Sequence, residues 1–144
     1  YIARTHGKSM MFATLFFGVL NPVTGSFIYM NGGHEPPVIF NADGPKEYLT
    51  LTGPPVGLVP DMEYGFRETR LEPGDTLLAI TDGVIDARDV EGKFFSRERL
   101  LSLLEQPAAS ASSLLARIEA DLHTHSGGAE QFDDITMLAV RRKA

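Results

Sequence analysis

In Leu77-Leu78-Ala79-Ile80-Thr81-Asp82-Gly83, strand-forming apolar residues lead directly into an aspartate. A second stretch has the reverse order and reads Asp133-Asp134-Ile135-Thr136-Met137-Leu138-Ala139-Val140. The two stretches predict two strands, with Asp82 at the end of one and Asp133 at the start of the other. Carboxylates at strand ends can point out of a rigid sheet into a cleft. Two that converge would form a hard oxygen site, which suits Mg²⁺ or Mn²⁺ rather than zinc.

Such a site points to metal-assisted hydrolysis, with a phosphate ester as the best-fitting substrate. Each acidic motif also has an ordinary structural interpretation. Asp82-Gly83 can be a simple turn after a strand, and Asp133-Asp134 can cap a strand with two solvated charges. Adjacent carboxylates repel each other, and a nearby cation relieves that repulsion, which favours the metal interpretation. On a strand only one of Asp133 and Asp134 faces a given site, and the other would cap the backbone.

The rest of the sequence predicts an α+β fold in which strands come first and helices later. The helix over residues 97–105 follows Ser96 as N-cap, and the helix over residues 112–125 ends at the glycines after it. The apolar run over residues 10–20 is too short for the ~20 residues that span a bilayer, and we expect a buried strand there. Strands are predicted over residues 12–20, 26–31, 38–40, 47–51, 64–71, 76–81 and 135–140.

Composition excludes several classes of protein. There are 13 Lys and Arg against 19 Asp and Glu, and an acidic chain without a basic face is a poor nucleic-acid binder. The absence of cysteine excludes disulfides, thiolate metal sites and a cysteine nucleophile, and it fits a cytoplasmic protein. We see no signal peptide and expect no membrane insertion. The chain opens without methionine almost directly into a strand, so we expect it to be cut from something longer.

Histidines give weaker signals. The loop over residues 31–37 holds Asn31 and His34, and His34 could act as a general acid near a leaving group. The alternative, which we favour, is that His34 holds its loop by bonding to backbone. His123 and His125 are two residues apart, which on a helix places them on different faces, so zinc is not expected.

Taken together, these segments closely resemble the metal-dependent protein Ser/Thr phosphatases of the protein phosphatase 2C class (PPM-type), in their bacterial SpoIIE- and RsbU-like branch. The matching stretches occur in the family's order and cover essentially the whole chain. They are residues 12–20 (FATLFFGVL), 29–37 (YMNGGHEPP), 53–58 (GPPVGL), 71–77 (LEPGDTL), 81–88 (TDGVIDAR), 92–95 (GKFF) and 133–136 (DDIT).

The resemblance implies an antiparallel β-sandwich flanked by helices, with a centre of two Mn²⁺ or Mg²⁺ ions at one end of the sheets. It implies that Asp82, Gly83 and Asp133 belong to the metal site, that Asp82 and Asp133 are the catalytic residues, and that a water bridging the cations attacks the phosphorus in line. The remaining candidates, in supporting roles, are Asn31, His34, Asp86 and Asp134.

This sequence departs from the family pattern in places. Asp86 stands where the family usually has Glu, Gly32 where it usually has Ala, and Ser96 where Gly is common. The family's first third, which carries further metal ligands, has no counterpart here. Residues 1–144 therefore correspond to the C-terminal two-thirds of an N-terminally truncated domain, with about half of the metal centre. We expect weak metal affinity and low activity, and exposed sheet edges that favour a homodimer or a strand-exchanged oligomer.

Three functions fit the sequence to different degrees. The first is a phosphoserine/phosphothreonine phosphatase in signal transduction or stress response. By resemblance, its substrate is a phosphorylated protein of the anti-sigma-factor-antagonist type. The second is a module of the same fold that binds a phosphoprotein or a regulator without turnover. The third is an unrelated cation-binding β domain in which both acidic motifs are plain turns, and the ordered run of motifs makes it the least favoured.

Overall fold

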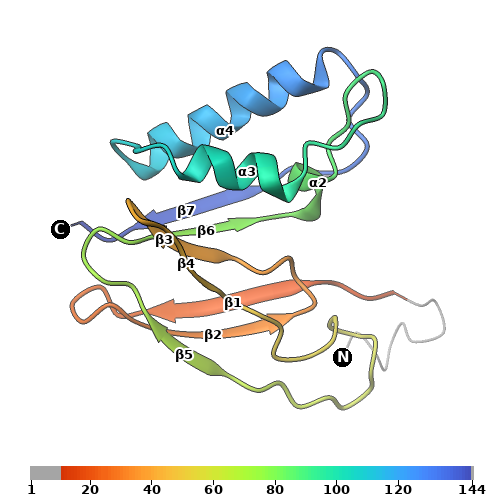
Figure 1. The fold of residues 1–144 in the computed structure, drawn as a ribbon. Helices are drawn as coiled ribbons and strands as arrows, with labels where there is room; N and C mark the ends of the chain where they lie inside the picture. The colour runs from red at the N-terminus through yellow and green to blue at the C-terminus, as the bar shows by residue number, and fades with distance from the viewer. Residues whose placement is uncertain (1–10, 144) are drawn as a thin grey trace. The chain divides into compact units, whose positions relative to one another are not determined.

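The computed structural model describes residues 11–143, and they form an α+β fold with two antiparallel sheets (Figure 1). The chain groups into two compact units. The first unit runs Tyr1–Pro36 and Leu49–Glu72, and the second runs Pro37–Tyr48 and Pro73–Ala144. The predicted α+β class with antiparallel strands is confirmed. No helix in the described part of the chain is long and apolar enough to cross a membrane.

The first unit holds a three-stranded sheet in the order β1-β2-β5. The strands are β1 (Leu15–Leu20), β2 (Ser26–Gly32) and β5 (Arg67–Arg70), and each neighbouring pair is antiparallel. The turn between β1 and β2 is stabilised by Asn21, whose Oδ1 accepts from the backbone N–H groups of Val23 and Thr24 at 3.0 and 3.1 Å. The hairpin expected from the turn residues is therefore present.

The prediction of a buried strand over residues 10–20 is wrong for the described part of it. β1 begins at Leu15, and its alternate side chains Leu15, Phe17 and Val19 are 43%, 51% and 58% exposed. The reason is that β1 is an edge strand, paired only with β2 among the described residues, and one row of its side chains is uncovered. Met10 lies outside the described residues. The hydrophobic run in the sequence predicted the strand, but it could not show whether other elements would cover the side chains of that strand.

The second unit holds a four-stranded sheet in the order β4-β3-β6-β7. All five residues of β6 are buried, as suits a strand with neighbours on both sides. Two predicted strands are displaced in sequence: β4 starts three residues before the expected 47–51, and β7 starts two residues after the expected 135. The bounds are β3 (Val38–Asn41), β4 (Gly44–Tyr48), β6 (Thr76–Ile80) and β7 (Met137–Arg141).

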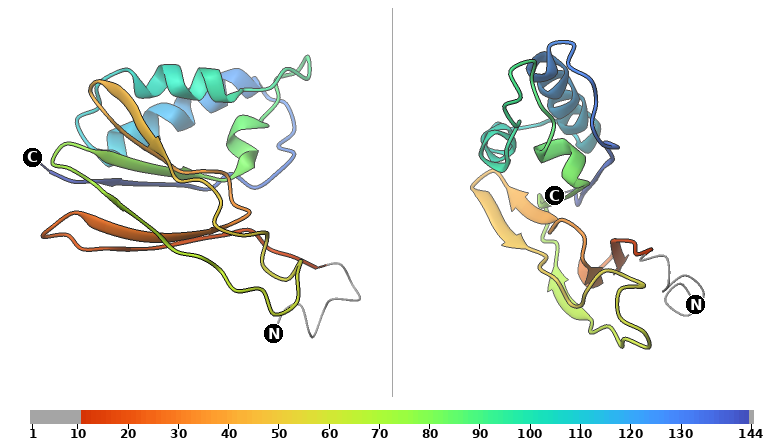
Figure 2. Two further views of the ribbon diagram at one scale, coloured as in Figure 1. Left: turned by 60° about the horizontal axis from the view of Figure 1, so that its bottom comes forward. Right: turned by 90° about the vertical axis from the view of Figure 1, so that its right-hand side faces the viewer.

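Helices α3 (Arg97–Leu104) and α4 (Ala111–Ser126) lie side by side on one face of this sheet (Figures 1 and 2). Both confirm the predicted helices, and Ser96 caps α3 by accepting from the Arg99 N–H. At the C-terminal end of α4, Gly127 caps the helix in the left-handed conformation, with φ of 55°. The apolar core of the unit is Val38, Phe40, Leu78, Ile80, Val84, Phe95, Leu100, Leu104, Leu114, Ile118 and Leu122.

Candidate functional site

Asp82 opens a short helix that the sequence did not predict. β6 ends at Ile80, Thr81 is extended, with φ −78° and ψ 156°, and α2 (Asp82–Ile85) follows at once. The Oδ1 atom of Asp82 accepts from the N–H of Gly83 at 3.1 Å. The carboxylate is exposed and has no ion pair among residues 11–143. Asp82 therefore presents acceptor oxygens to solvent from a fixed place at the end of the central strand.

Asp133 and Asp134 lie in the loop before β7, and this loop extends two residues further than the predicted strand start at residue 135. β7 begins only at Met137, so the expectation that strand alternation separates the two side chains is wrong. The loop has its own local bonds: Asp133 Oδ1 accepts from the Asp134 N–H at 2.8 Å, and Gln131 Nε2 donates to the Asp133 carbonyl at 2.8 Å. Both aspartates are exposed.

Thr81 ties the two aspartate segments together. Its hydroxyl donates to the Asp134 carbonyl at 2.9 Å and accepts from the Thr136 N–H at 2.9 Å. Its own N–H donates to the Thr136 carbonyl at 3.0 Å, which extends the pairing of β6 and β7 by one step. Because these bonds hold the segments side by side, Asp82 and Asp133 belong to one end of the sheet.

Gly83 is at the closest point of this contact. A Cβ atom placed on Gly83 would lie 2.4 Å from the Asp134 carbonyl oxygen and 3.1 Å from its carbonyl carbon. Neither is a flexible side-chain atom, so no larger residue fits without moving backbone. The need for glycine here comes from space alone. Gly83 was predicted to contact metal, and this contact gives it a packing reason that the sequence could not show.

A cleft of about 880 Å³ opens beside this junction, within the second unit. Its size falls in the range of small-molecule and peptide sites. Gly83, Asp86 and Asp133 form one part of its wall, whereas Asp82 and Asp134 do not line it. The remaining wall comes from α4 and from the segments on either side of it. Its polar and aromatic members are Arg88, Phe94, Glu119, His123, Ser126, Glu130, Gln131 and Phe132.

The side chains at this site are of the type that binds a hard cation, but there are too few of them to complete a metal site. Carboxylate oxygens are the ligands that Mg²⁺ and Mn²⁺ prefer. Between Met11 and Lys143, however, no group of three or more Asp, Glu, His or Cys side chains could hold a metal ion. Asp82 and Asp133 fit as part of such a centre, and a full ligand set needs donors beyond the described residues.

Asn31 and His34 belong to the first unit, where local contacts account for both. Asn31 is fully buried. Its Nδ2 donates to the Leu49 carbonyl at 3.0 Å, and its Oδ1 accepts from the His34 N–H at 2.9 Å. The Nδ1 atom of His34 lies 2.8 Å from the Glu35 carbonyl oxygen, and its ring packs against Phe16 at 6.2 Å. These contacts agree with the alternative in which His34 holds its loop by bonding to backbone. A role for His34 as general acid stays a prediction.

Arg88, Phe94 and Phe132 were not singled out from the sequence. The Arg88 guanidinium carbon lies 4.8 Å from the centre of the Phe94 ring and 5.0 Å from that of Phe132. All three residues line the cleft. Phe132 is distant from the other two along the chain, and a stack between such residues leaves no local pattern in a sequence.

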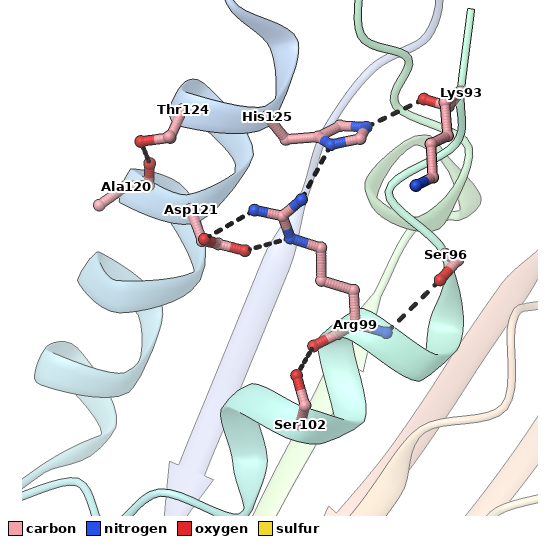
Figure 3. Close-up of polar contacts among 8 residues, drawn as sticks. All are labelled: Lys93, Ser96, Arg99, Ser102, Ala120, Asp121, Thr124 and His125. Atoms are coloured by element: carbon pink, nitrogen blue, oxygen red, sulfur yellow. Dashed lines mark hydrogen bonds and ion pairs between the residues drawn. The ribbon is translucent and has the colours of Figure 1, made fainter.

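A second polar cluster joins α3 to α4 (Figure 3). Arg99 donates to both carboxylate oxygens of Asp121, with Nε–Oδ2 at 2.6 Å and Nη2–Oδ1 at 3.0 Å. The hydrogen bond from Arg99 lowers the pKa of Asp121, and the same bond raises the pKa of Arg99. Arg99 Nη1 also lies 3.0 Å from His125 Nδ1, and His125 Nε2 lies 3.0 Å from the Lys93 carbonyl oxygen. Since a guanidinium only donates, Nδ1 accepts and Nε2 donates to Lys93.

Comparison with known proteins agrees with this architecture. The family model "Stage II sporulation protein E (SpoIIE)" matches residues 1–143. Protein IcfG of Synechocystis is 44% identical over 99% of this chain and 22% of its own length. Phosphoserine phosphatase RsbU of Bacillus subtilis is 29% identical over 92% of this chain and 40% of its own length.

A solved structure shows the same fold. The PP2C phosphatase domain of the cell fate determinant SpoIIE from Bacillus subtilis, with a fragment of its regulatory domain, is 16% identical. It superimposes with a TM-score of 0.75 over 90% of this chain and 38% of that chain. This chain thus spans less than half the length of the curated relatives it matches. From its sequence and its fold, the chain belongs to the SpoIIE family of PP2C-type phosphatase domains.

Proposed function

We propose that this chain is part of a divalent-cation-dependent phosphatase that removes phosphate from phosphoserine or phosphothreonine on a signalling protein. One observation carries the proposal: Thr81 and Gly83 hold the Asp82 and Asp133 segments against each other at the edge of a cleft. The name of RsbU, a phosphoserine phosphatase, supports the choice of ester. A small protein of the anti-sigma-factor-antagonist type is the proposed substrate, and a cytoplasmic location stays a prediction.

In this proposal the chain's own residues supply position and charge. Asp82 and Asp133 would hold Mn²⁺ or Mg²⁺, together with ligands from beyond the described residues. The chemistry that such cations supply when bound is neutralisation of phosphoryl charge and activation of water. Thr81 fixes the spacing of the two segments, and the close packing at Gly83 restricts their movement relative to each other. Phosphoryl transfer depends mostly on positioning, so a rigid junction is what this chemistry needs.

The test is turnover of p-nitrophenyl phosphate and of a phosphoserine peptide by the full-length protein, measured against Mn²⁺ and Mg²⁺ concentration. Asp82→Asn and Asp133→Asn are each expected to lower kcat/KM at least ~100-fold, because each removes a charged ligand. The matched control is Asp43→Asn, which changes an exposed turn carboxylate of the same unit and should leave turnover unchanged.

The proposal fails if the wild-type protein shows no cation-dependent turnover, or if Asp82→Asn is as active as the control. Absent turnover with retained binding of the phosphopeptide would instead identify a binding module of this fold. Light scattering on the same samples tests the predicted homodimer or strand exchange, and a monomer at all concentrations would contradict it.

A further inference from the structure

Arg88 contacts two aromatic rings in the wall of the cleft. The rings of Phe94 and Phe132 lie 4.8 and 5.0 Å from the guanidinium carbon, at distances typical of cation–π contacts. Arg88 makes no hydrogen bond or ion pair through its guanidinium with any residue of the described part. The five N–H donors of the guanidinium are therefore not used by any described residue.

The backbone that carries Arg88 is rigid. Arg88 and Phe94 face each other in a β-bridge, flanked by the bonds Asp89 N–H to Lys93 carbonyl at 3.0 Å and Phe95 N–H to Ala87 carbonyl at 2.7 Å. The turn of this hairpin is closed by Asp89 Oδ1, which accepts from the Lys93 N–H at 2.9 Å. That bond holds the pKa of Asp89 below its ordinary value.

The base of the hairpin is fixed by the cluster in Figure 3. His125 bonds the Lys93 carbonyl, and its ring meets the buried Phe95 ring edge-on at 5.5 Å. Arg99 covers the same Phe95 ring at 5.1 Å. Since α3 and α4 both hold the hairpin, Arg88 is presented to the cleft from a preorganised support, which lowers the entropic cost of using it.

We infer that Arg88, in cation–π contact with Phe94 and Phe132, is a specificity-determining residue that binds an oxyanion of the phosphorylated protein segment in the cleft. This inference rests on the proposed function. A planar guanidinium with free edge donors matches a carboxylate or a phosphoryl group in bidentate fashion. The cleft of about 880 Å³ holds more than a phosphoryl group, so side chains next to the phosphoserine also enter it. The oxyanion is the phosphoryl group itself or a carboxylate beside it.

The surroundings of Arg88 favour a single oxyanion over a strongly acidic ligand. Asp86, Glu119, Glu130 and Asp133 also line the cleft, and their charge would repel a run of carboxylates. Arg88 is the one arginine in the described wall, so it is the natural partner for one negative group at one position. The exposed ring of Phe132 adds an apolar surface beside it.

The experiment compares three substrates with the full-length protein. They are p-nitrophenyl phosphate, a phosphoserine peptide with glutamates beside the phosphoserine, and the same peptide with glutamines. The variants are Arg88→Ala, Arg88→Lys and Phe132→Leu, with Arg70→Ala as the control for an exposed arginine of the first unit that does not line the cleft. Calorimetric titration with inorganic phosphate and with the unphosphorylated glutamate peptide gives a readout that does not depend on turnover.

Arg88→Ala is expected to lower kcat/KM about tenfold or more, with Arg88→Lys and Phe132→Leu between it and wild type. If the phosphoryl group is the ligand, all three substrates lose equally and inorganic phosphate binds about tenfold more weakly. If a flanking carboxylate is the ligand, only the glutamate peptide loses rate and affinity. The inference is overturned if Arg88→Ala matches Arg70→Ala on every substrate and in both titrations. Should wild type show no turnover, the titrations still decide the role of Arg88 separately from the proposed function.

Discussion

Two groups of carboxylates in the second unit differ in what their oxygens contact. Asp121 has both oxygens bonded to Arg99, and its side chain is only 27% exposed. Asp82 and Asp133 each accept one N–H from the next residue and are otherwise open to solvent. The first arrangement satisfies a charge within the protein, and the second leaves acceptor capacity for something else.

The two arginines show the same contrast. Arg99 donates hydrogen bonds to Asp121 and His125 and so joins α3 to α4. Arg88 contacts the rings of Phe94 and Phe132, and its N–H donors remain available to a ligand in the cleft. Arg99 and Asp121 are therefore paired with each other, whereas Arg88, Asp82 and Asp133 have no oppositely charged partner among the described residues. Breaking each kind should have a different signature: stability for the first, activity for the second.

The largest effect is expected from Gly83→Ala. The new Cβ would meet the Asp134 carbonyl oxygen at 2.4 Å, so the loop carrying Asp133 must move away from α2. Overpacking of this kind costs about 3 kcal/mol at the upper end of its usual range. The temperature of thermal unfolding and the rate of cation-dependent turnover should both fall, because this contact both stabilises the fold and positions Asp133.

Gly65→Ala is the matched control. Its Cβ would have the Thr52 carbonyl oxygen as nearest neighbour at 3.9 Å, an ordinary contact. That variant should unfold at nearly the wild-type temperature. If Gly83→Ala unfolds there too and keeps its activity, the close approach is not what positions Asp133.

A smaller effect, on stability alone, is expected from Arg99→Ala. It removes a bidentate, charge-assisted pair and leaves Asp121 partly buried without that partner, which should lower the free energy of unfolding by about 2 kcal/mol. Arg88→Ala should change the free energy of unfolding by less than about 0.5 kcal/mol, because Arg88 and the two rings that it contacts are exposed. Urea unfolding measures both. Equal losses in the two variants would contradict the division between paired and unpaired charges.

The long helices were predictable because their signals are local. Leu100 and Leu104 in α3, and Leu114, Ile118 and Leu122 in α4, recur at helical spacing and are buried. Caps at Ser96 and Gly127 fixed the ends to within a residue or two. Strand existence was equally visible, but strand ends and coverage were not, since both depend on neighbours that the sequence does not name.

The candidate site was predictable only in part. The two aspartate motifs indicated that Asp82 and Asp133 belong together, and the contacts of Thr81 show how their segments meet. α2 was missed because four residues carry no periodicity. The strand after Asp133 was expected to begin at Ile135, because that residue continues an apolar run, but it begins at Met137. The stack of Arg88 with Phe132 joins segments far apart in the chain, and only the fold brings them together.

The smallest expected effect is the acid dependence of the helix pair. Arg99 holds the pKa of Asp121 below its ordinary value of 3.8. A carboxyl whose pKa is lower in the folded chain stabilises the fold above its unfolded pKa. That contribution is lost as the pH falls through the folded pKa. The wild-type urea midpoint should therefore decline as the pH drops from about 4 downward, and in Arg99→Ala this part of the decline should be smaller.

The difference between the two proteins isolates the contribution of Asp121. Asp89 and Glu98 also have lowered pKa values, chiefly because backbone N–H groups bond to them, and for Glu98 also because of the Ser96 hydroxyl; Arg99→Ala keeps all of these donors. Their effect is thus common to both proteins and cancels in the comparison. Curves that run parallel from pH 7 to pH 3 would mean that the Arg99–Asp121 pair adds no acid-sensitive stability. The contrast between paired and open carboxylates would then rest on geometry alone.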